Sequence, residues 1–330
     1  MVFALRTLLR GISQVFFLRS APAGALILIG LALASPHAAA MVLLGAAVQT
    51  AAAWVLGPRE LVADGLMGYN GALVGAASSL SMAGVNDTAL SLGLTLVGAL
   101  ACFPVHRLLL VLFAAPALRR FELPVVTAPF CLVAGLLFGV LQPIIRPGAV
   151  TTDPGPVHGS LLGLFNSFAE VMVVDGPVAG AVILAGLLLG SWAVGLWAAA
   201  GAVLALVLAL LLTGDMVAVS TGLLGYSAVL VAIALGHVFT APRPVWRRGV
   251  EVLIGVALAV ALRWLLDPTP LPTYTWPFIL ALWLVLIGRS VLSRGSRDPR
   301  RAPSPRAAAG PDGTARAAAQ AARRRGGAAG

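Results

Sequence analysis

The sequence LPVVTAPF at residues 123–130 returns as LPTYTWPF at residues 271–278, and both fit the pattern Leu-Pro-x-x-Thr-x-Pro-Phe. A proline lacks a backbone donor and frees a carbonyl one turn earlier, so each stretch predicts a broken helix. At membrane depth such a break is tolerated only where it is buried in protein or lines a cavity. Two breaks that meet would present carbonyls and the hydroxyls of Thr127 and Thr275 to a polar solute. The alternative is that each threonine bonds its own helix, as is common in membrane helices.

The composition around these stretches is that of an integral membrane protein. The 330 residues are 59% hydrophobic and 10% charged, and the mean hydropathy is +0.97. A bilayer core takes about 20 apolar residues per helix, so residues 22–292 have room for about ten spans. We therefore expect an all-α integral membrane fold. The expected spans are roughly 22–38, 39–56, 62–82, 89–117, 125–142, 178–194, 195–212, 217–238, 248–266 and 274–292.

Three stretches recur in the same order, which predicts an internal duplication. Each half holds five of the expected spans, and an odd number makes the second half enter from the opposite face. The sequence therefore predicts an inverted five-helix repeat, a common plan among transporters. The matching stretches are 8–31 with 164–187, 65–70 with 222–227, and 123–130 with 271–278.

The duplication divides the chain into four parts. We expect a first membrane repeat at 1–145, a Pro/Gly-rich connector at 146–160 and a second membrane repeat at 161–292. Residues 293–330 are rich in Ala, Gly, Pro and Arg and cannot bury a core, so they predict a disordered basic tail.

Arginine placement predicts the orientation. All 22 basic residues are Arg, and nine of them follow residue 290. They lie mostly between apolar runs and in the tail, which indicates membrane orientation rather than a nucleic-acid surface, despite the net charge of +10. With both termini cytoplasmic, most arginines lie inside, Arg146 and Arg263 are exceptions, and the pattern does not assign a depth to Arg19. We expect a multi-pass protein of the cell (inner) membrane.

Gln14 and Glu170 occupy matching places before a full span in each half. An ionisable group at membrane depth is costly and predicts a functional site, although both residues could instead cap helices at the interface. Phe17 follows Gln14 by three residues and could form an apolar wall, whereas its counterpart Val173 is smaller.

Tyr69 and Leu73 lie four residues apart, as do Tyr226 and Leu230, so each pair shares one helix face. Facing pairs from the two halves could form a flat apolar slot that admits a planar molecule. The alternative is ordinary core packing.

The sequence contains no motif typical of ATP hydrolysis or proteolysis. It contains no Walker A, HExxH or GxSxG motif, and its four histidines are scattered. Cys102 and Cys131 have no CxxC spacing and are expected to pack in helices. We expect no enzyme activity, no cofactor and no metal.

These motifs resemble those of the urea transporter family. GLMGYNGALVG at 65–75 and GLLGYSAVL at 222–230 resemble its signature, and the paired Leu-Pro-x-x-Thr-x-Pro-Phe stretches are similar to its other motif. Gln14-Val15-x-Phe17 and Glu170-Val171 match its short pore-helix sequences. The resemblance covers about residues 8–292.

The resemblance implies a homotrimer with one pore through each protomer. Each pore would lie at the inverted-repeat interface, between two half-membrane helices and the broken ends of two spans, and would conduct urea passively. The implied roles are central for Thr127 and Thr275, pore-helix for Gln14 and Glu170, and slot wall for Phe17, Val171, Tyr69, Leu73, Tyr226 and Leu230. The family slot is usually formed by phenylalanine, so Tyr69 and Tyr226 depart from it.

Three alternatives stay open on the sequence. The first is a channel for another small neutral solute, such as a short amide, ammonia or water. The second is an intramembrane enzyme, for which Glu170 lacks a catalytic partner. The third is ion-coupled transport, which the scarcity of mid-span ionisable residues disfavours. The expected partners are urea and membrane lipids, with no nucleic acid.

Overall fold

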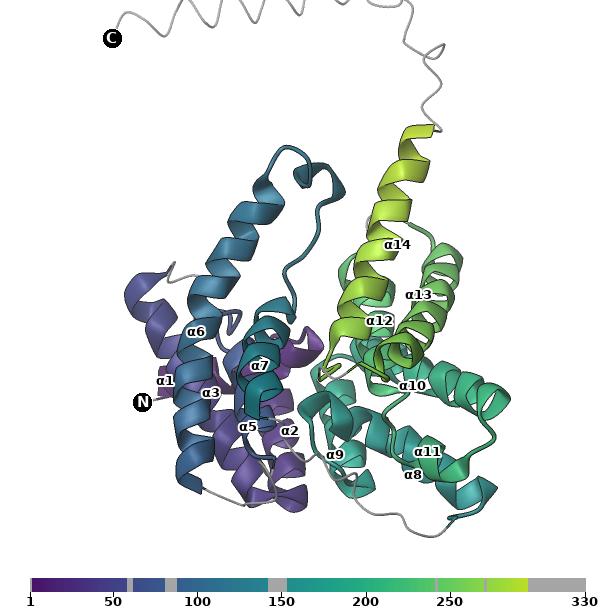
Figure 1. Ribbon diagram of the computed structural model, residues 1–330, viewed down its shortest axis with the longest axis horizontal. Helices are drawn as coiled ribbons and strands as arrows, with labels where there is room; N and C mark the ends of the chain where they lie inside the picture. The colour runs from purple at the N-terminus through teal and green to yellow at the C-terminus, as the bar shows by residue number, and fades with distance from the viewer. Residues whose placement is uncertain are drawn as a thin grey trace, which may run out of the picture. The chain divides into compact units, whose positions relative to one another are not determined.

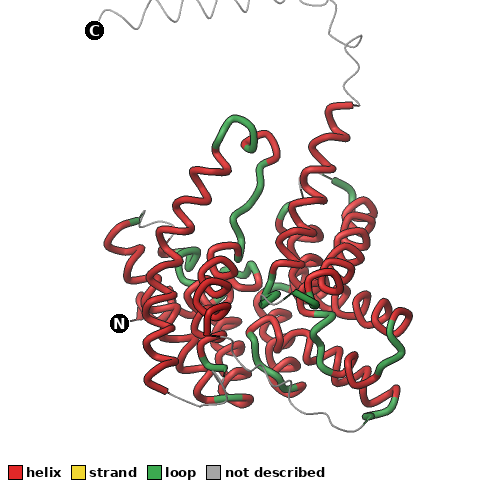
Figure 2. Tube along the Cα trace, viewed as in Figure 1, coloured by secondary structure: helices red, strands yellow, loops and turns green. Residues whose placement is uncertain are grey.

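The computed structural model describes residues 2–57, 62–80, 88–141, 153–240, 243–269 and 272–295 (Figure 1). Every regular element in these ranges is helical, which confirms the all-α prediction (Figure 2). The chain as far as Leu286 forms one compact unit, and a second unit begins at Ile287. The predicted connector before residue 153, the tail after residue 295, Arg146 and Leu271 lie outside the described residues.

The first half contains six described α-helices and two short 3₁₀ turns. Its helices are α1 (Val2–Ser13), α2 (Ala21–Ala34), α3 (Pro36–Leu56), α5 (Tyr69–Ser78), α6 (Thr88–Ala114) and α7 (Ala128–Leu141), and its turns are η1 (Gln14–Phe16) and η2 (Arg119–Phe121). The second half contains α8 (Pro156–Ala169), η3 (Glu170–Met172), α9 (Pro177–Gly190), α10 (Trp192–Leu212), α11 (Met216–Ser220), α12 (Tyr226–Ile233), the π-helix η4 (Ala234–Val238), α13 (Val245–Leu266) and α14 (Trp276–Gly295).

Four described helices are long and apolar enough to cross a membrane: α3, α6, α10 and α13. Two further pairs pass the same test together but are bent, by 76° between α1 with η1 and α2, and by 73° between α8 with η3 and α9. The described residues therefore hold four spans by length and composition, or six if each bent pair counts as one. Shorter apolar helices include α7, α12 and α14.

Two expected spans are interrupted, which corrects the predicted boundaries 62–82 and 217–238. In the first, the helix that runs to Ser78 begins only at Tyr69, and in the second, α11 and α12 are separate helices. The reason is a left-handed glycine in each, Gly65 at φ 80° and Gly222 at φ 75°. A helix cannot run through this conformation, which glycine adopts without a steric penalty.

Many large apolar side chains on the outer faces of the long helices are exposed. Val97, Leu108 and Val111 on α6 are examples, and α10 and α13 carry similar ones. Contiguous apolar surface of this extent is rare on soluble monomers and suits contact with lipid. The exposed side chains therefore agree with a membrane protein.

Residues matched between the halves share their backbone conformation. Phe17 and Val173 both adopt left-handed φ angles, of 60° and 57°, and Val126 and Tyr274 do so at 41° and 35°. Such angles are uncommon for residues other than glycine, so two coinciding pairs are unusual. The matched stretches therefore have the same local structure.

Helices α2 and α9 pack against each other through small residues (Figure 1). A Cβ at Gly30 would lie 3.0 Å from the carbonyl oxygen of Ala179, and a Cβ at Gly186 would lie 3.3 Å from that of Ala23. Because Gly30 matches Gly186 and Ala23 matches Ala179, the contact is reciprocal, as across a two-fold axis. The sequence stretches that match are thus the ones that meet.

We expect Gly24→Ala to destabilise the protein. A Cβ there would lie 1.9 Å from the Leu9 carbonyl oxygen, within the close contact of α1 and α2. Overpacking of this kind typically costs about 1–3 kcal/mol, which a thermal unfolding scan in detergent would detect as a lower Tm. Gly93→Ala on α6 is the matched control, since a Cβ there meets nothing within 4 Å. Equal Tm values for the two variants would contradict the prediction.

Candidate functional site

The two threonines of the repeated motif meet at the centre of the candidate site. Their Oγ1 atoms lie 2.7 Å apart, within hydrogen-bond distance, although the residues are separated by 148 positions. Each threonine is only 3% exposed. The sulfur of Cys131, one turn into α7, lies 3.0 Å from the Thr275 hydroxyl. The structure therefore brings the two predicted breaks together through their hydroxyl groups.

Each threonine lies at the start of a helix that follows an irregular segment. Helix α7 begins at Ala128 and α14 at Trp276, directly after Thr127 and Thr275. A proline at the second helical position is tolerated here, because the backbone N–H groups in the first turn of a helix have no acceptor within that helix. The motif thus stops the chain from forming one continuous helix and places a hydroxyl at the break.

The hydroxyls of Tyr69 and Tyr226 donate hydrogen bonds to the backbone carbonyls just before Thr127 and Thr275. The Tyr69 hydroxyl donates to the Val126 carbonyl oxygen at 2.7 Å, and the Tyr226 hydroxyl donates to that of Tyr274. Both tyrosines are buried. Sequence reasoning treated them as slot walls and missed this bracing contact. The signal available was the phenolic group itself, which needs a partner when it is buried.

The break of the first half has additional polar support that the second half lacks. Asn70 accepts a hydrogen bond from the Phe130 backbone N–H at 3.1 Å, and its amide nitrogen lies 3.5 Å from the Val126 carbonyl oxygen. Ser227 takes the place of Asn70 in the second half, and its hydroxyl oxygen is buried with no geometric hydrogen bond to the part of the chain that the structure describes. The polar groups around the two breaks therefore differ.

Two further residues that sequence reasoning missed fix the same region. The Gln49 side chain accepts a hydrogen bond from the Gly71 N–H at 2.6 Å, which joins α3 to α5. The Trp283 ring N–H donates to the Pro124 carbonyl oxygen at 2.9 Å and joins α14 to the first break. Neither residue belongs to a repeated motif, so the pairwise match of the halves gave no sign of them.

The apolar candidates are buried or partly buried in the main core. Leu73, Leu230 and Val171 are buried in the main core. Phe17 is partly buried and packs edge to face on Phe278, with ring centroids 6.1 Å apart. Phe278 follows Thr275 by three residues, so Phe17 links the short helix of the first half to the break of the second.

Gln14 and Glu170 lie at the ends of the two bent helices, and both are partly buried. The Gln14 amide donates to the Asp64 carbonyl oxygen at 3.0 Å. No side chain or backbone group in the described ranges donates a hydrogen bond to the Glu170 carboxylate, which interacts electrostatically with Asp175 and Arg263. The Glu170 oxygens are therefore available to accept hydrogen bonds from a solute.

The arrangement suits a small neutral polar molecule. Hydroxyl, carbonyl and carboxylate oxygens are set among apolar side chains, which is the general make-up of ligand sites. No group of three or more His, Cys, Asp or Glu side chains within the described part of the chain is placed to hold a metal ion.

The comparisons with known proteins all lead to the same family. The family described as urea transporter matches residues 5–290. The chain is 30% identical to urea transporter 1 of Ovis aries over 301 residues, which cover 84% of this chain and 75% of the relative. It is 30% identical to urea transporter 1 of Capra hircus with the same coverage, and 29% identical to that of Rattus norvegicus over 85% of this chain and 76% of the relative.

Tyr69→Phe is expected to lower stability. It removes the 2.7 Å hydrogen bond to the Val126 carbonyl oxygen and leaves that oxygen the longer 3.5 Å contact with the Asn70 amide, a loss of about 1 kcal/mol. Tyr274→Phe is a matched control, because the Tyr274 hydroxyl is buried with no hydrogen-bond partner among the described residues. Thermal unfolding should show a lower Tm for Tyr69→Phe and an equal or higher Tm for Tyr274→Phe. The reverse order would disprove the bracing role of Tyr69.

Proposed function

Because the chain belongs to the urea transporter family, as its motifs predicted, we propose that it is a passive channel that conducts urea down its gradient across the cell (inner) membrane. The observation that carries the proposal is the contact of Thr127 with Thr275, whose hydroxyl oxygens lie 2.7 Å apart directly before the starts of α7 and α14. In this proposal the hydroxyl pair is the narrowest point of the pathway, and urea passes by replacing their mutual hydrogen bond with bonds to itself.

The energetics of urea suit such a pathway. Urea is planar and neutral, and each of its polar groups costs roughly 2–7 kcal/mol to place in apolar surroundings without a partner. Oxygen atoms of Glu170, Gln14 and the two threonines would accept bonds from the urea N–H groups. Each step along the pathway then exchanges bonds to water for bonds to protein oxygens.

The apolar side chains would provide selectivity. Phe17, Leu73, Val171 and Leu230 would form the walls against which the flat faces of urea slide, with Tyr69 and Tyr226 behind them as braces of the breaks. Small ions gain too little from such walls to offset their lost hydration, so they are excluded without a charged filter. Catalysis has no part in this proposal.

The proposed architecture is an inverted repeat of five spans per half. The shared left-handed residues and the reciprocal contact of α2 with α9 support it. Helix α8 begins at Pro156, so the second half begins inside the expected connector 146–160 and not at residue 161. In this arrangement the bent pairs contribute the half-membrane helices. We extend the proposal to a homotrimer with one pore per protomer and with both termini cytoplasmic. The tail expected from residue 293 begins no earlier than residue 296, because α14 continues to Gly295.

Stopped-flow light scattering with purified protein in liposomes tests the proposed function. Urea permeability should exceed that of protein-free liposomes and should not respond to an imposed proton or sodium gradient. Acetamide, ammonia and water are measured in parallel, because the oxygen pathway does not by itself separate urea from close analogues. Urea permeability equal to that of protein-free liposomes would refute the proposal. A higher permeability for one of the comparators would assign the channel to that solute.

The double substitution Thr127→Val and Thr275→Val is expected to reduce urea permeability strongly. Valine keeps the shape of threonine but removes both hydroxyls, so urea would pass the centre with unpaired polar groups. A loss of one neutral hydrogen bond in the rate-limiting position, about 1 kcal/mol, already lowers the flux about fivefold. Thr95→Val is the control, since Thr95 is buried on α6 and its hydroxyl contacts the Met41 sulfur at 3.6 Å. Normal urea flux from a folded double variant would contradict the central role.

A further inference from the structure

The two central threonines occupy matching places in the repeat, yet their hydroxyl groups have different neighbours. The Thr275 oxygen lies 2.7 Å from the Thr127 oxygen and 3.0 Å from the Cys131 sulfur. Among the described residues, Thr127 and Cys131 are the hydrogen-bonding partners of the Thr275 hydroxyl, whereas the Thr127 hydroxyl has Thr275 alone. The central pair is therefore symmetric in sequence and asymmetric in its hydrogen bonds.

The repeat itself shows where this difference comes from. Cys131 follows Thr127 by four residues, and Ile279 follows Thr275 by the same spacing. Cys131, on α7, is only 1% exposed and reaches the threonine hydroxyl of the opposite half. Ile279, on α14, is fully buried and has no polar group to offer Thr127. One threonine hydroxyl thus has a second buried partner, and the other has an aliphatic side chain in the matching place.

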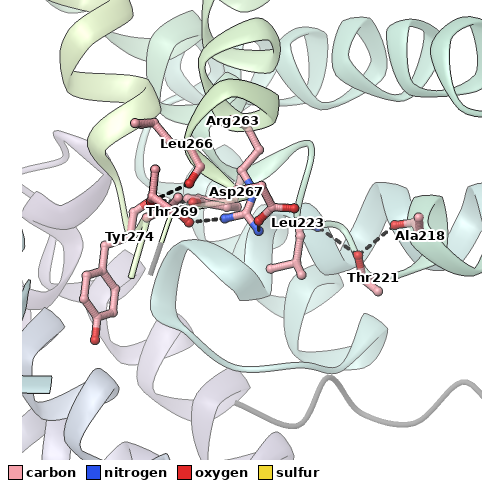
Figure 3. Close-up of polar contacts among 10 residues, drawn as sticks. Ala218, Thr221, Leu223, Arg263, Leu266, Asp267, Thr269 and Tyr274 are labelled. Atoms are coloured by element: carbon pink, nitrogen blue, oxygen red, sulfur yellow. Dashed lines mark hydrogen bonds and ion pairs between the residues drawn. The ribbon is translucent and has the colours of Figure 1, made fainter. Parts of the chain in front are cut away.

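The polar side chains on the α13 side of the second break are engaged with one another. The Arg263 guanidinium forms an ion pair with Asp267 at 2.8 Å and donates a hydrogen bond to the Thr273 hydroxyl (Figure 3). These contacts support the segment that leads into the break, two residues before Thr275. They leave the Thr275 hydroxyl to its two partners from the first half.

The number of protons available determines what the sulfur can do. A hydroxyl carries one proton and two lone pairs, whereas a thiol is a weak donor and a weak acceptor. In a row of two hydroxyls and one thiol, the stronger O–H donors are satisfied when Thr127 donates to Thr275 and Thr275 donates to the sulfur. A buried polar group without a partner is costly, so a hydroxyl that loses this order also loses stability.

We propose that Cys131 is a positioning residue, whose sulfur accepts the hydrogen bond of the Thr275 hydroxyl and so fixes the direction of the central hydrogen bonds. The Thr275 oxygen then keeps its lone pairs for the urea N–H groups, while the Thr127 hydroxyl turns from Thr275 to the urea oxygen. Urea thus meets an acceptor and a donor at the narrowest point, which match its own two kinds of polar group. The inference rests on the proposed function, since it concerns the same pathway.

Urea permeability of Cys131→Ala in liposomes tests this role. Without the sulfur, the Thr275 proton loses its acceptor and turns toward the solute, where it meets the urea N–H groups with the same polarity. We expect the urea permeability to fall about two- to fivefold, the change in rate that one weak hydrogen bond produces. Cys131→Ser offers a hydroxyl oxygen in the same place and should keep the permeability close to that of the unaltered protein.

A double-mutant cycle separates positioning from a change in packing. Cys131→Ala should have no further effect on the permeability of Thr275→Val, because the proton that the sulfur accepts is already absent. In Thr127→Val, the same substitution should still lower the permeability about two- to fivefold. A cavity that disturbs α7 would instead lower the permeability in both backgrounds, and that result would overturn the proposal.

Cys102→Ala is the matched control. Cys102 is the second cysteine of the chain, is fully buried on α6, and makes no hydrogen bond to either central threonine in the described structure. Its urea permeability should equal that of the unaltered protein, and a fall equal to that of Cys131→Ala would overturn the proposal. Thermal unfolding and size-exclusion profiles establish that each variant is folded. If Cys131→Ala does not fold, Cys131→Val takes its place, since valine also lacks a hydrogen-bonding group.

The outcomes separate this inference from the proposed function. An unaltered protein that does not conduct urea contradicts the proposed function, and the inference falls with it. An unaltered protein that conducts urea, with the same permeability in Cys131→Ala, overturns the role of Cys131 alone. A Cys131→Ser protein as impaired as Cys131→Ala would also overturn that role, because the hydroxyl of serine can accept the same hydrogen bond.

Discussion

The backbone carbonyls that precede Thr127 and Thr275 impose the constraint on which the rest of the site depends. A helix broken at membrane depth leaves polar backbone groups that lipid cannot satisfy, so protein donors must reach them. The tyrosine hydroxyls at the starts of α5 and α12 do so, and this requires both helices to begin beside the breaks. The left-handed glycines Gly65 and Gly222 allow those starts, because they end the preceding turns and redirect the chain. The repeated Gly-x-x-Gly-Tyr motif therefore combines a glycine turn with a tyrosine hydroxyl that donates a hydrogen bond to a backbone carbonyl.

Close helix packing makes this arrangement possible. Helices in lipid gain little from apolar burial against one another, so they associate through small residues that let backbones approach. A Cβ at Gly45 would lie 2.0 Å from the Gly71 carbonyl oxygen, and one at Gly201 would lie 2.5 Å from that of Ala228. These matched contacts hold α5 on α3 and α12 on α10. These glycines thus have a specific use, which is to bring the helices that carry the tyrosines onto their neighbours.

Sequence reasoning reached the all-helical fold, the family and the pairs of matching residues, because these depend on apolar runs and repeated motifs. It placed Thr127 and Thr275 together before any geometry was known. It misjudged the helix boundaries in 62–82 and 217–238, because hydropathy does not register a left-handed glycine between two apolar segments. Gln49 and Trp283 could not have been found in this way. Their importance lies in which distant backbone group each one reaches, and that is determined only when the helices are packed.

The duplication keeps the backbone of the two halves alike while their polar groups differ. Gln14 corresponds to Glu170, Asn70 to Ser227, and Val126 to Tyr274, yet the φ angles of Val126 and Tyr274 agree within a few degrees, at 41° and 35°. A backbone that tolerates such substitutions allows the two halves to carry different polar side chains. The first half supports its break with the neutral amide of Asn70, whereas in the second half the partly buried Arg263 guanidinium donates to Thr273, two residues before Thr275. The two halves therefore share their backbone shape, because the matched positions keep the same φ angles, and differ in the polar side chains that support each threonine.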